Sequence, residues 1–331
     1  MSRAKAIASH RRMCNKVNHF ISNCPHTLTE AKAMQLSLQT QTTSFLGVSV
    51  GVRARPRTRV GKPSHHPFHP RIRNVVASAT SSTFAQKTWS NPTGAVLDEI
   101  VTKTVYAAAR PFVWNDIDVG GRMVIVKLRD GSLWVHSPVS LDEETRRAVD
   151  ALGCVKHVVS PNYEHVKYAQ EWKEAYPNCT LYGCPLLKEK KPDIPYDVDL
   201  VNGTPEAWMG EFDMEWFSCE ETPIVGGAFF NEVVFHHRPS GTLCVTDVFW
   251  NYPSDTVGDV SVPLGTRVWK FLMDQVYLPL YKRLMVVDRE GYEASARRVS
   301  EEWQWSTLIP CHGTVIRGDR ARAALRSHLL D

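Results

Sequence analysis

The chain has 331 residues, of which 43% are hydrophobic and 22% are charged, and its formal net charge is +4. This length suits one large or two ordinary domains, and the apolar content is that of a globular protein. Residues 1–90 contain fourteen Lys and Arg but a single acid, Glu30, whereas the remainder contains 25 basic and 34 acidic residues. The positive charge therefore belongs to one end of the chain, and we expect no nucleic-acid partner for the folded part.

The first 80 residues are rich in Ser, Thr, Arg and His and almost free of acid, which is typical of an organelle transit peptide. The stretch Val75-Val76-Ala77-Ser78-Ala79 resembles a plastid processing site. We expect residues 1–80 to be a disordered transit peptide that directs the protein to the chloroplast stroma, with the mitochondrion as second choice. A basic tail that binds an acidic partner is the alternative. An apolar run of 18 residues is missing from the sequence, so we expect no membrane span.

The first structured elements, which we expect from about residue 95, alternate between strands and a helix. Two apolar runs, residues 122–128 and 132–136, flank Asp130-Gly131, and this pattern predicts a β-hairpin. Residues 141–152 predict a helix, because acids fill its first turn and a glycine follows its last residue.

Residues 155–176 predict a buried strand, a tight loop and a helix. Pro161 ends the strand, since proline has no backbone N–H. From Glu164 onward the apolar residues recur with helical spacing, so we expect the helix to begin there. Glu164 and His165 would then lie at the carboxyl end of a sheet strand, where open α/β sheets usually have their sites.

The second half of the chain continues this alternation. Residues 232–237 and 242–247 predict a second hairpin, in which one of His236 and His237 is expected to face solvent. Helical patterns follow over residues 265–285 and 288–304, then a short strand at 307–310 and a closing helix at 319–330. Strands that alternate with helices predict an α/β fold.

Three of the predicted strand ends carry side chains of the metal-ligand type. They are Asn162, Glu164 and His165 after the first strand, Asp247 after the second hairpin, and His312 after the last strand. Imidazole and carboxylate groups suit zinc, iron or manganese, and such an ion makes water nucleophilic near neutral pH.

These segments resemble the motifs of the metallo-β-lactamase superfamily, and they occur in its order. Ser160-Pro161-Asn162-Tyr163-Glu164-His165 is similar to His-x-His-x-Asp-His, and Asp247 ends a strand as the metal-bridging Asp of the superfamily does. Ile309-Pro310-Cys311-His312-Gly313 resembles the final Pro-x-His-Gly step. The resemblance covers roughly residues 105–318 and implies a single-domain αββα sandwich, which we place at residues 95–331.

A narrower resemblance is to a domain of unknown function found in plants and cyanobacteria. It rests on Arg122-Met123, on Leu133-Trp134-Val135-His136-Ser137-Pro138, and on Pro161-Asn162 followed by His165.

The sequence departs from the superfamily pattern at several ligand positions. Ser160 and Asn162 replace the first two His residues, Glu164 replaces the Asp, and the loop at 223–226 has no His. The resemblance leaves His165, Asp247 and His312 as ligands for one zinc, iron or manganese ion.

Glu164 is the candidate catalytic residue, as a general base, and an ordinary carboxylate at a helix N-terminus is the alternative. Asn162 is the candidate substrate-binding residue, and hydrogen bonding to the loop backbone is the alternative.

Two functions follow from this reading. The first is a metallo-hydrolase-like protein that acts on an unknown small-molecule substrate with a reduced, mononuclear metal site. The second is a non-catalytic descendant of the fold that serves as a small-molecule or protein binding module in the plastid. The sequence leaves the substrate and the oligomeric state open.

Overall fold

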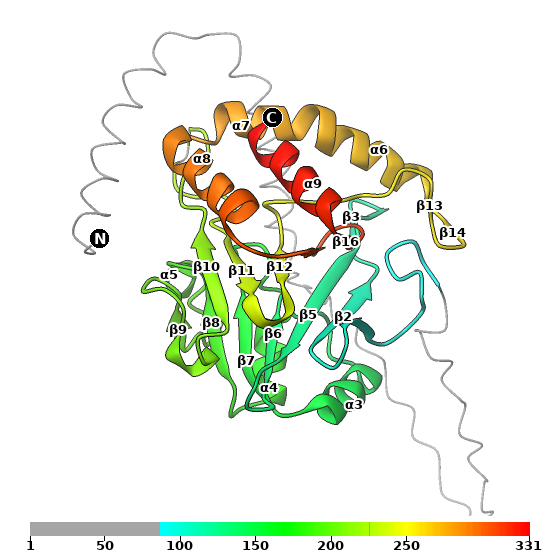
Figure 1. The fold of residues 1–331 in the computed structure, drawn as a ribbon, viewed down its shortest axis with the longest axis vertical. Helices are drawn as coiled ribbons and strands as arrows, with labels where there is room; N and C mark the ends of the chain where they lie inside the picture. Colours follow the sequence, from blue (N-terminus) through cyan, green and yellow to red (C-terminus); the bar gives the residue numbers. More distant parts are fainter. Residues whose placement is uncertain (1–86, 225) are drawn as a thin grey trace, which may run out of the picture. The chain divides into compact units, whose positions relative to one another are not determined.

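Two mixed β-sheets pack face to face in the part of the chain that this computed structural model describes, residues 87–224 and 226–331 (Figure 1). The expected leader, residues 1–80, lies outside the described residues. One continuous apolar core joins the facing sides of the sheets: Val124 and Val158 of the first sheet belong to the same buried cluster as Phe235 and Ile309 of the second.

The first sheet has seven strands in the order β1-β2-β5-β6-β7-β8-β9. The predicted hairpin is confirmed, since β5 and β6 are antiparallel neighbours. Strands β6, β7 and β8 are parallel, so their carboxyl ends lie at one edge of the sheet. The bounds are β1 Asp98–Val101, β2 Val105–Arg110, β5 Gly121–Lys127, β6 Leu133–His136, β7 Val155–Ser160, β8 Thr180–Gly183 and β9 Val198–Asp199.

The second sheet has five strands in the order β10-β11-β12-β15-β16. The second predicted hairpin is also confirmed, as β11 pairs antiparallel with β12. Because β12 and β15 are parallel, the residues that follow them leave the sheet at the same edge. The bounds are β10 Phe212–Trp216, β11 Val233–His237, β12 Thr242–Val245, β15 Thr307–Pro310 and β16 Ile316–Arg317. Two short ribbons complete the strands: β3 Val113–Trp114 with β4 Ile117–Asp118, and β13 Thr256–Val257 with β14 Val260–Ser261.

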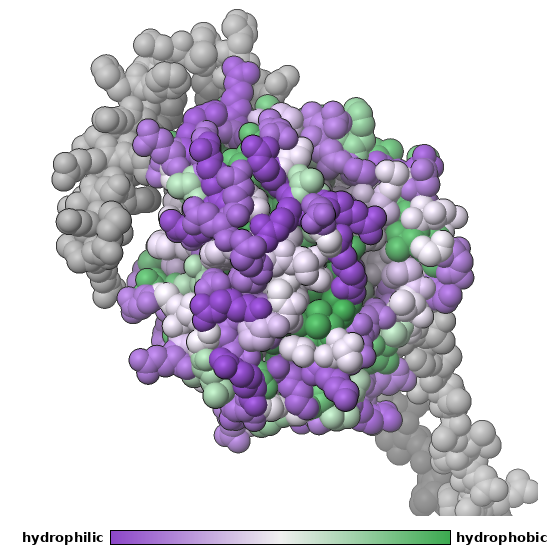
Figure 2. Space-filling model, viewed as in Figure 1, coloured by the Kyte–Doolittle hydropathy of each residue, from purple (hydrophilic) through white to green (hydrophobic). Residues whose placement is uncertain are grey.

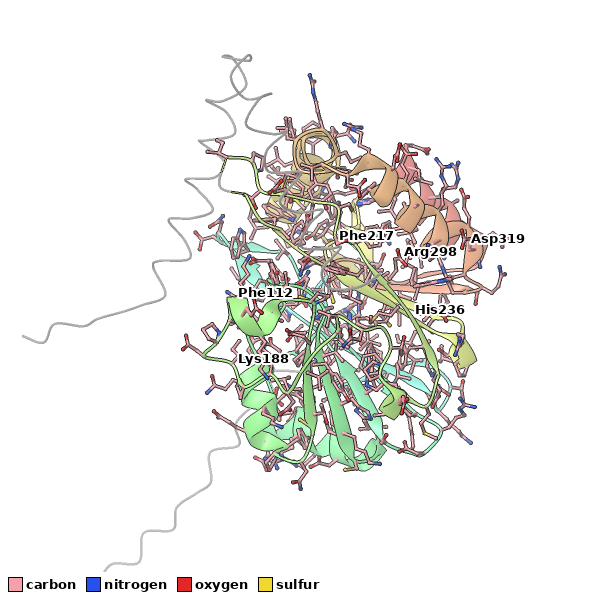
Figure 3. The ribbon with its side chains drawn as sticks, turned by 90° about the vertical axis from the view of Figure 1, so that its left-hand side faces the viewer. Phe112, Lys188, Phe217, His236, Arg298 and Asp319 are labelled. Atoms are coloured by element: carbon pink, nitrogen blue, oxygen red, sulfur yellow. The ribbon has the colours of Figure 1, made fainter. Side chains whose placement is uncertain are left out.

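Helices cover the outer faces of both sheets. Figure 3 shows Lys188, at α5, and Arg298 and Asp319, beside α8 and α9, on opposite sides of the molecule, with Phe217 between them. These layers confirm the expected αββα sandwich. The helices are α3 Glu143–Leu152, α4 Ala169–Ala175, α5 Leu187–Lys190, α6 Leu264–Leu272, α7 Leu278–Leu284, α8 Arg289–Arg297 and α9 Asp319–Leu330. Wider π-helical turns continue α6 into α7 at Met273–Tyr277 and extend α8 over Arg298–Glu302. None of the helices among the described residues has the length and apolar run needed to cross a bilayer.

Three local expectations were wrong. The helix expected from Glu164 begins at Ala169, because Asn162 Oδ1 accepts the backbone N–H groups of Glu164 and His165 and holds these residues in a turn. His236 and His237 are both buried, since Asp213 and Glu211 supply carboxylate partners for them. Packing also begins before residue 95, because Trp89 is buried in a small cluster with Tyr252.

An aromatic cluster at the centre of the core encloses an ionisable ring. Trp134 stacks on His136, and Phe235 meets His136 edge-on, each at 5.6 Å between ring centroids. Both ring nitrogens of His136 are buried without a hydrogen-bond partner. Burial lowers the pKa of His136 to about 3, with a smaller effect from His165, so the ring is neutral in the folded protein at neutral pH.

His136 therefore makes the fold sensitive to acid. The unfolded chain binds a proton at this residue at a pH of about 6.5, while the folded chain does so only near 3. The contribution of the neutral His136 ring to the free energy of unfolding is fully present above about pH 6.5, and it is lost as the pH drops toward 3. The wild type becomes less stable between pH 7 and pH 5. We predict that His136→Leu makes this decrease in the free energy of unfolding about 2 kcal/mol smaller, measured by urea unfolding. Phe235→Leu disturbs the same cluster without removing a titrating group, so its pH dependence should match the wild type. An equal loss in all three chains would contradict the prediction.

Candidate metal centre

Three side chains converge at one edge of the sandwich: His165, Asp247 and His312. His165 Nε2 lies 3.3 Å from Asp247 Oδ2, and His312 Nε2 lies 3.5 Å from Asp247 Oδ1. One ligand atom from each residue lies within 4.8 Å of the other two. The three side chains are 14–15% exposed, so they are enclosed without being sealed from solvent.

The parallel strands place two of these ligands side by side. Asp247 follows β12 and His312 follows β15, and Asn251 N–H donates to the carbonyl of His312 at 3.0 Å. The next residue, Gly313, has φ +94°, and a Cβ there would lie 2.0 Å from the carbonyl oxygen of Asn251. A glycine is therefore required where the chain leaves the site.

Oxygen atoms behind the two imidazole rings fix their orientation. His312 Nδ1 donates to the carbonyl of Gly120 at 2.8 Å, so its Nε2 is turned toward Asp247. Ser137 Oγ lies 2.6 Å from His165 Nδ1. Ser137 has φ +51°, a left-handed conformation that costs a non-glycine residue roughly 1 kcal/mol or more. Hydrogen bonds of this kind orient metal-binding His residues in proteins.

Asn162 and Glu232 hold the segments that bear the ligands. Asn162 is completely buried; its Nδ2 donates to Asp247 Oδ2 at 2.6 Å, to Thr246 Oγ1 at 3.0 Å and to Glu232 Oε2 at 3.3 Å. Glu232 accepts the backbone N–H groups of Thr246, Asp247 and Val248 at 2.6–2.9 Å. The loop that carries Asp247 is thus built around a second, buried carboxylate.

Glu232 was not predicted as part of the site. The one available signal was its position directly before the apolar run Val233-Val234-Phe235. A carboxylate that is buried with such a run needs hydrogen-bond partners or must remain protonated. Ser137 and Gly313 stand in the quoted motifs, but no role at the site was predicted for them, and Gly120 was not identified at all.

Opposing effects set the charges of the cluster. Burial by itself would raise the pKa of Asp247, but the two imidazoles outweigh it and hold that pKa well below its usual range. Burial lowers the pKa of His312, whereas Asp247 and the Gly120 carbonyl raise it, and the net direction is upward. Burial and the neighbouring Asp247 charge raise the pKa of Glu232 to about 7. The site therefore stabilises an ionised aspartate between two imidazoles.

The other predicted residues occupy different positions. The side chain of Asn162 contacts protein groups on all sides, and its oxygen supports the backbone of the loop. Glu164 is exposed and lies in the turn before α4, not at a helix N-terminus. Partial desolvation and the charge of Asp247 raise the pKa of Glu164. Ser160 is buried and accepts a hydrogen bond from Tyr196 at 2.8 Å.

The three converging residues fit a single metal ion. The two His–Asp contacts, 3.3 and 3.5 Å, reach different oxygens of Asp247. One ligand atom from each residue lies within 4.8 Å of the other two, so a small movement of the side chains would let all three share an ion with bonds of about 2.0–2.1 Å. Two imidazoles and a carboxylate suit zinc, iron or manganese. Within residues 87–224 and 226–331, this is the one cluster of His, Cys, Asp and Glu with such spacing.

Comparison with known proteins gives a family match over part of the chain and distant structural similarities. Residues 104–264 match the family model described as "Domain of unknown function (DUF4336)", a span that includes Asn162–His165 and Asp247 and ends before His312. No curated protein matches the chain.

Solved metallo-β-lactamases are similar to this chain in structure. One from Pontibacter korlensis has 13% identity and a TM-score of 0.47, covering 71% of this chain and 96% of its own. One from Hirschia baltica has 10% identity and a TM-score of 0.46, with 70% and 96% covered. The mono-zinc form of FIM-1 from Pseudomonas aeruginosa has 12% identity and a TM-score of 0.45, with 69% and 92% covered. Identities this low carry no information about substrate. The fold itself has two mixed sheets between helical layers, with His165, Asp247 and His312 at one edge.

Glu232 should be essential for the stability of the loop that bears Asp247. Gln in its place replaces one acceptor oxygen by an NH₂ group and leaves at least one buried backbone N–H without a partner. We predict that Glu232→Gln lowers the free energy of unfolding at pH 8 by about 2 kcal/mol or more, measured by urea unfolding. The exposed Glu206→Gln serves as the matched control and should stay within about 0.5 kcal/mol of the wild type. A neutral Glu232→Gln would show that the carboxylate does not organise the loop.

Ser137 should affect metal affinity more than stability. Ser137→Ala removes the oxygen next to His165 Nδ1 and leaves the ring free to rotate. We predict that the affinity for Zn²⁺ falls by roughly 10–100-fold, measured by competition with a chromophoric chelator. Ser240→Ala, which removes an equally close hydroxyl from the distant His237, is the control and should leave the affinity unchanged.

Proposed function

We propose that this protein is a metal-dependent hydrolase with a single-ion site at His165, Asp247 and His312. The observation that supports the proposal is the convergence of these residues, with both Nε2 atoms turned toward one carboxylate. The substrate class that suits such a site is a small molecule with an ester, thioester or phosphoester group. When bound, the ion supplies Lewis-acid polarisation of the carbonyl or phosphoryl oxygen.

The residues present support one ion rather than two. Ser160 and Asn162, where the superfamily has its first two His ligands, are both buried and hydrogen-bonded within the protein. The loop at residues 223–226, which stands where the superfamily has another His, contains none. A second set of ligands is therefore missing from the part of the chain described in atomic detail.

Glu164 is the residue we propose for proton transfer. Its carboxylate is exposed beside the cluster, and the upward shift of its pKa brings it closer to neutrality, where a general acid or base is most effective. Asn162, Ser137 and Gly120 are positioning groups, because each acts on a ligand and not on a substrate.

A non-catalytic binding module is the second candidate, and a specific observation favours it. The two imidazoles, Asp247 and Asn162 already satisfy one another's hydrogen-bonding groups and charges, so the cluster is stable as a purely structural element.

The proposal also includes the narrower placement in a plant and cyanobacterial branch and a location in the chloroplast stroma. These rest on the sequence motifs and on the composition of residues 1–80.

Metal content separates the two candidates. We predict that the full chain, purified from medium supplied with zinc, iron and manganese, contains about one ion per molecule by mass spectrometry. His165→Ala should lose it, because removal of a ligand costs more than the roughly 10–100-fold caused by the loss of a supporting hydrogen bond. His157→Ala is the matched control, since His157 is a buried histidine outside the cluster that bonds to Tyr182.

Hydrolysis is tested on the metal-loaded chain with p-nitrophenyl esters, a thioester and a phosphodiester. Glu164→Gln should keep the ion and reduce the rate by roughly 100-fold or more if Glu164 transfers the proton. A metal-free wild type whose stability is unchanged by chelators would overturn the metal proposal. A loaded protein that hydrolyses none of these esters would favour the binding module.

A further inference from the structure

The long helix from Leu264 to Leu284 has an apolar outer face. Its exposed side chains include Leu264 at 73%, Phe271 at 62% and Val268 at 49%. Of the fourteen large hydrophobic residues exposed in the described chain, eight lie on this helix or just beyond its end. They are Leu264, Val268, Phe271, Leu272, Val276, Leu280, Leu284 and Val287. We call these eight residues the outer stripe.

The opposite face of the same helix is already packed against the protein. Thr266 is fully buried, and Trp269, Met273 and Tyr277 pack against the cluster that contains Trp250 and Tyr252. The helix is therefore apolar on both sides, while in the described part of the chain other residues cover only one of them. A helix that is apolar all round normally has both faces out of water.

The neighbouring helices show the ordinary arrangement. The face of the molecule that α8 and α9 cover is predominantly hydrophilic (Figures 1 and 2). Helix α9 buries Ala321, Leu325 and Leu329 and turns charged residues to solvent. The outer stripe is thus a property of one helix and not of the whole surface.

The π-helical turn at Met273–Tyr277 helps to keep the stripe on one face. Between Leu272 and Leu284 the exposed apolar residues recur every four positions. In an α-helix of 3.6 residues per turn, side chains four positions apart do not line up, so a row of them winds around the helix axis. The wider π-helical turn reduces this winding.

The charges beside the stripe are mostly basic. Residues 264–289 contain five basic residues, Arg267, Lys270, Lys282, Arg283 and Arg289, and only two acids. Asp274 pairs with Lys270 and accepts from Trp250 Nε1 at 2.8 Å, and Asp288 caps α8. Arg267 pairs with Asp255 at 3.2 Å, so Lys282, Arg283 and Arg289 supply the positive charge that the nearby acids do not neutralise. The rest of the folded chain is acidic, because residues 91–331 carry 34 Asp and Glu against 25 Lys and Arg.

We propose that this helix is a peripheral membrane-binding element that lies flat on an anionic bilayer surface. The outer stripe would enter the boundary between headgroups and acyl chains, and the basic residues would meet the negatively charged headgroups. Apolar residues bordered by Lys and Arg are the composition that such interfacial helices require. A second copy packed on the stripe would bring two rows of like charges together, which disfavours self-association.

Vesicle binding by the full chain tests the proposal. Hydrogen–deuterium exchange is measured with vesicles of phosphatidylcholine alone and with vesicles that also contain phosphatidylglycerol. We predict that the anionic vesicles slow exchange in residues 264–287 and leave residues 289–302 unchanged. This readout separates the helix from the basic residues 1–86, whose charge would produce its own binding.

Paired substitutions isolate the contribution of the stripe. Phe271→Ser with Leu280→Ser should lower the vesicle partition coefficient in high salt by roughly tenfold or more, since two apolar side chains no longer leave water. Val201→Ser with Met209→Ser removes two exposed apolar residues away from this helix and should have no effect. Arg267→Gln with Arg283→Gln should weaken binding to anionic vesicles by roughly tenfold at low salt.

Two results would overturn the proposal. The first is protection by vesicles that is confined to residues outside 264–287. The second is a dimer, seen by light scattering, that Phe271→Ser with Leu280→Ser dissolves, since a second copy would then cover the stripe.

Discussion

Two carboxylates, the buried Glu232 and the largely enclosed Asp247, lie next to each other, and the site depends on how their charges are compensated. Asp247 is flanked by two imidazoles and an amide, and Glu232 accepts three backbone N–H groups. Neither group could be buried as an ion without these partners, because an unpaired charge in the interior is strongly destabilising. The same contacts that make the burial possible also fix the position of Asp247 between the two His side chains.

The sheet topology makes this arrangement possible. Strands β7, β12 and β15 come from two different sheets, yet the residues that follow them meet at one edge, because β12 and β15 are parallel and the sheets pack face to face. The bonds that orient the rings come from still other segments, Gly120 before β5 and Ser137 after β6. The site is therefore assembled from five separate stretches of chain, and any change that shifts one sheet against the other would separate the ligands.

Much of this could be predicted from the sequence, for definite physical reasons. Both hairpins, the strand at 307–310 and the helices at 143–152 and 319–330 have strong local signals, and all were confirmed. The metal-ligand candidates were found because their motifs occur in a known order.

The start of α4 was mispredicted, since periodicity cannot reveal that the side chain of Asn162 binds the backbone that follows it. His236 and His237 were mispredicted because their carboxylate partners, Asp213 and Glu211, lie on or beside a strand far away in the sequence.

The helix from Leu264 to Leu284 is tied to the site through its inner face alone. Tyr281 donates to Glu220 at 2.8 Å, and Glu220 accepts the backbone N–H groups of Phe230 and Asn231, the two residues directly before Glu232. Burial raises the pKa of Glu220 more than these bonds lower it, so the connection lies within the protein interior. The inner face thus accounts for the position of the helix, whereas no contact among residues 87–224 and 226–331 accounts for the apolar outer face. Because exposed apolar surface is unfavourable in water, a surface of this kind is explained by a contact outside the fold.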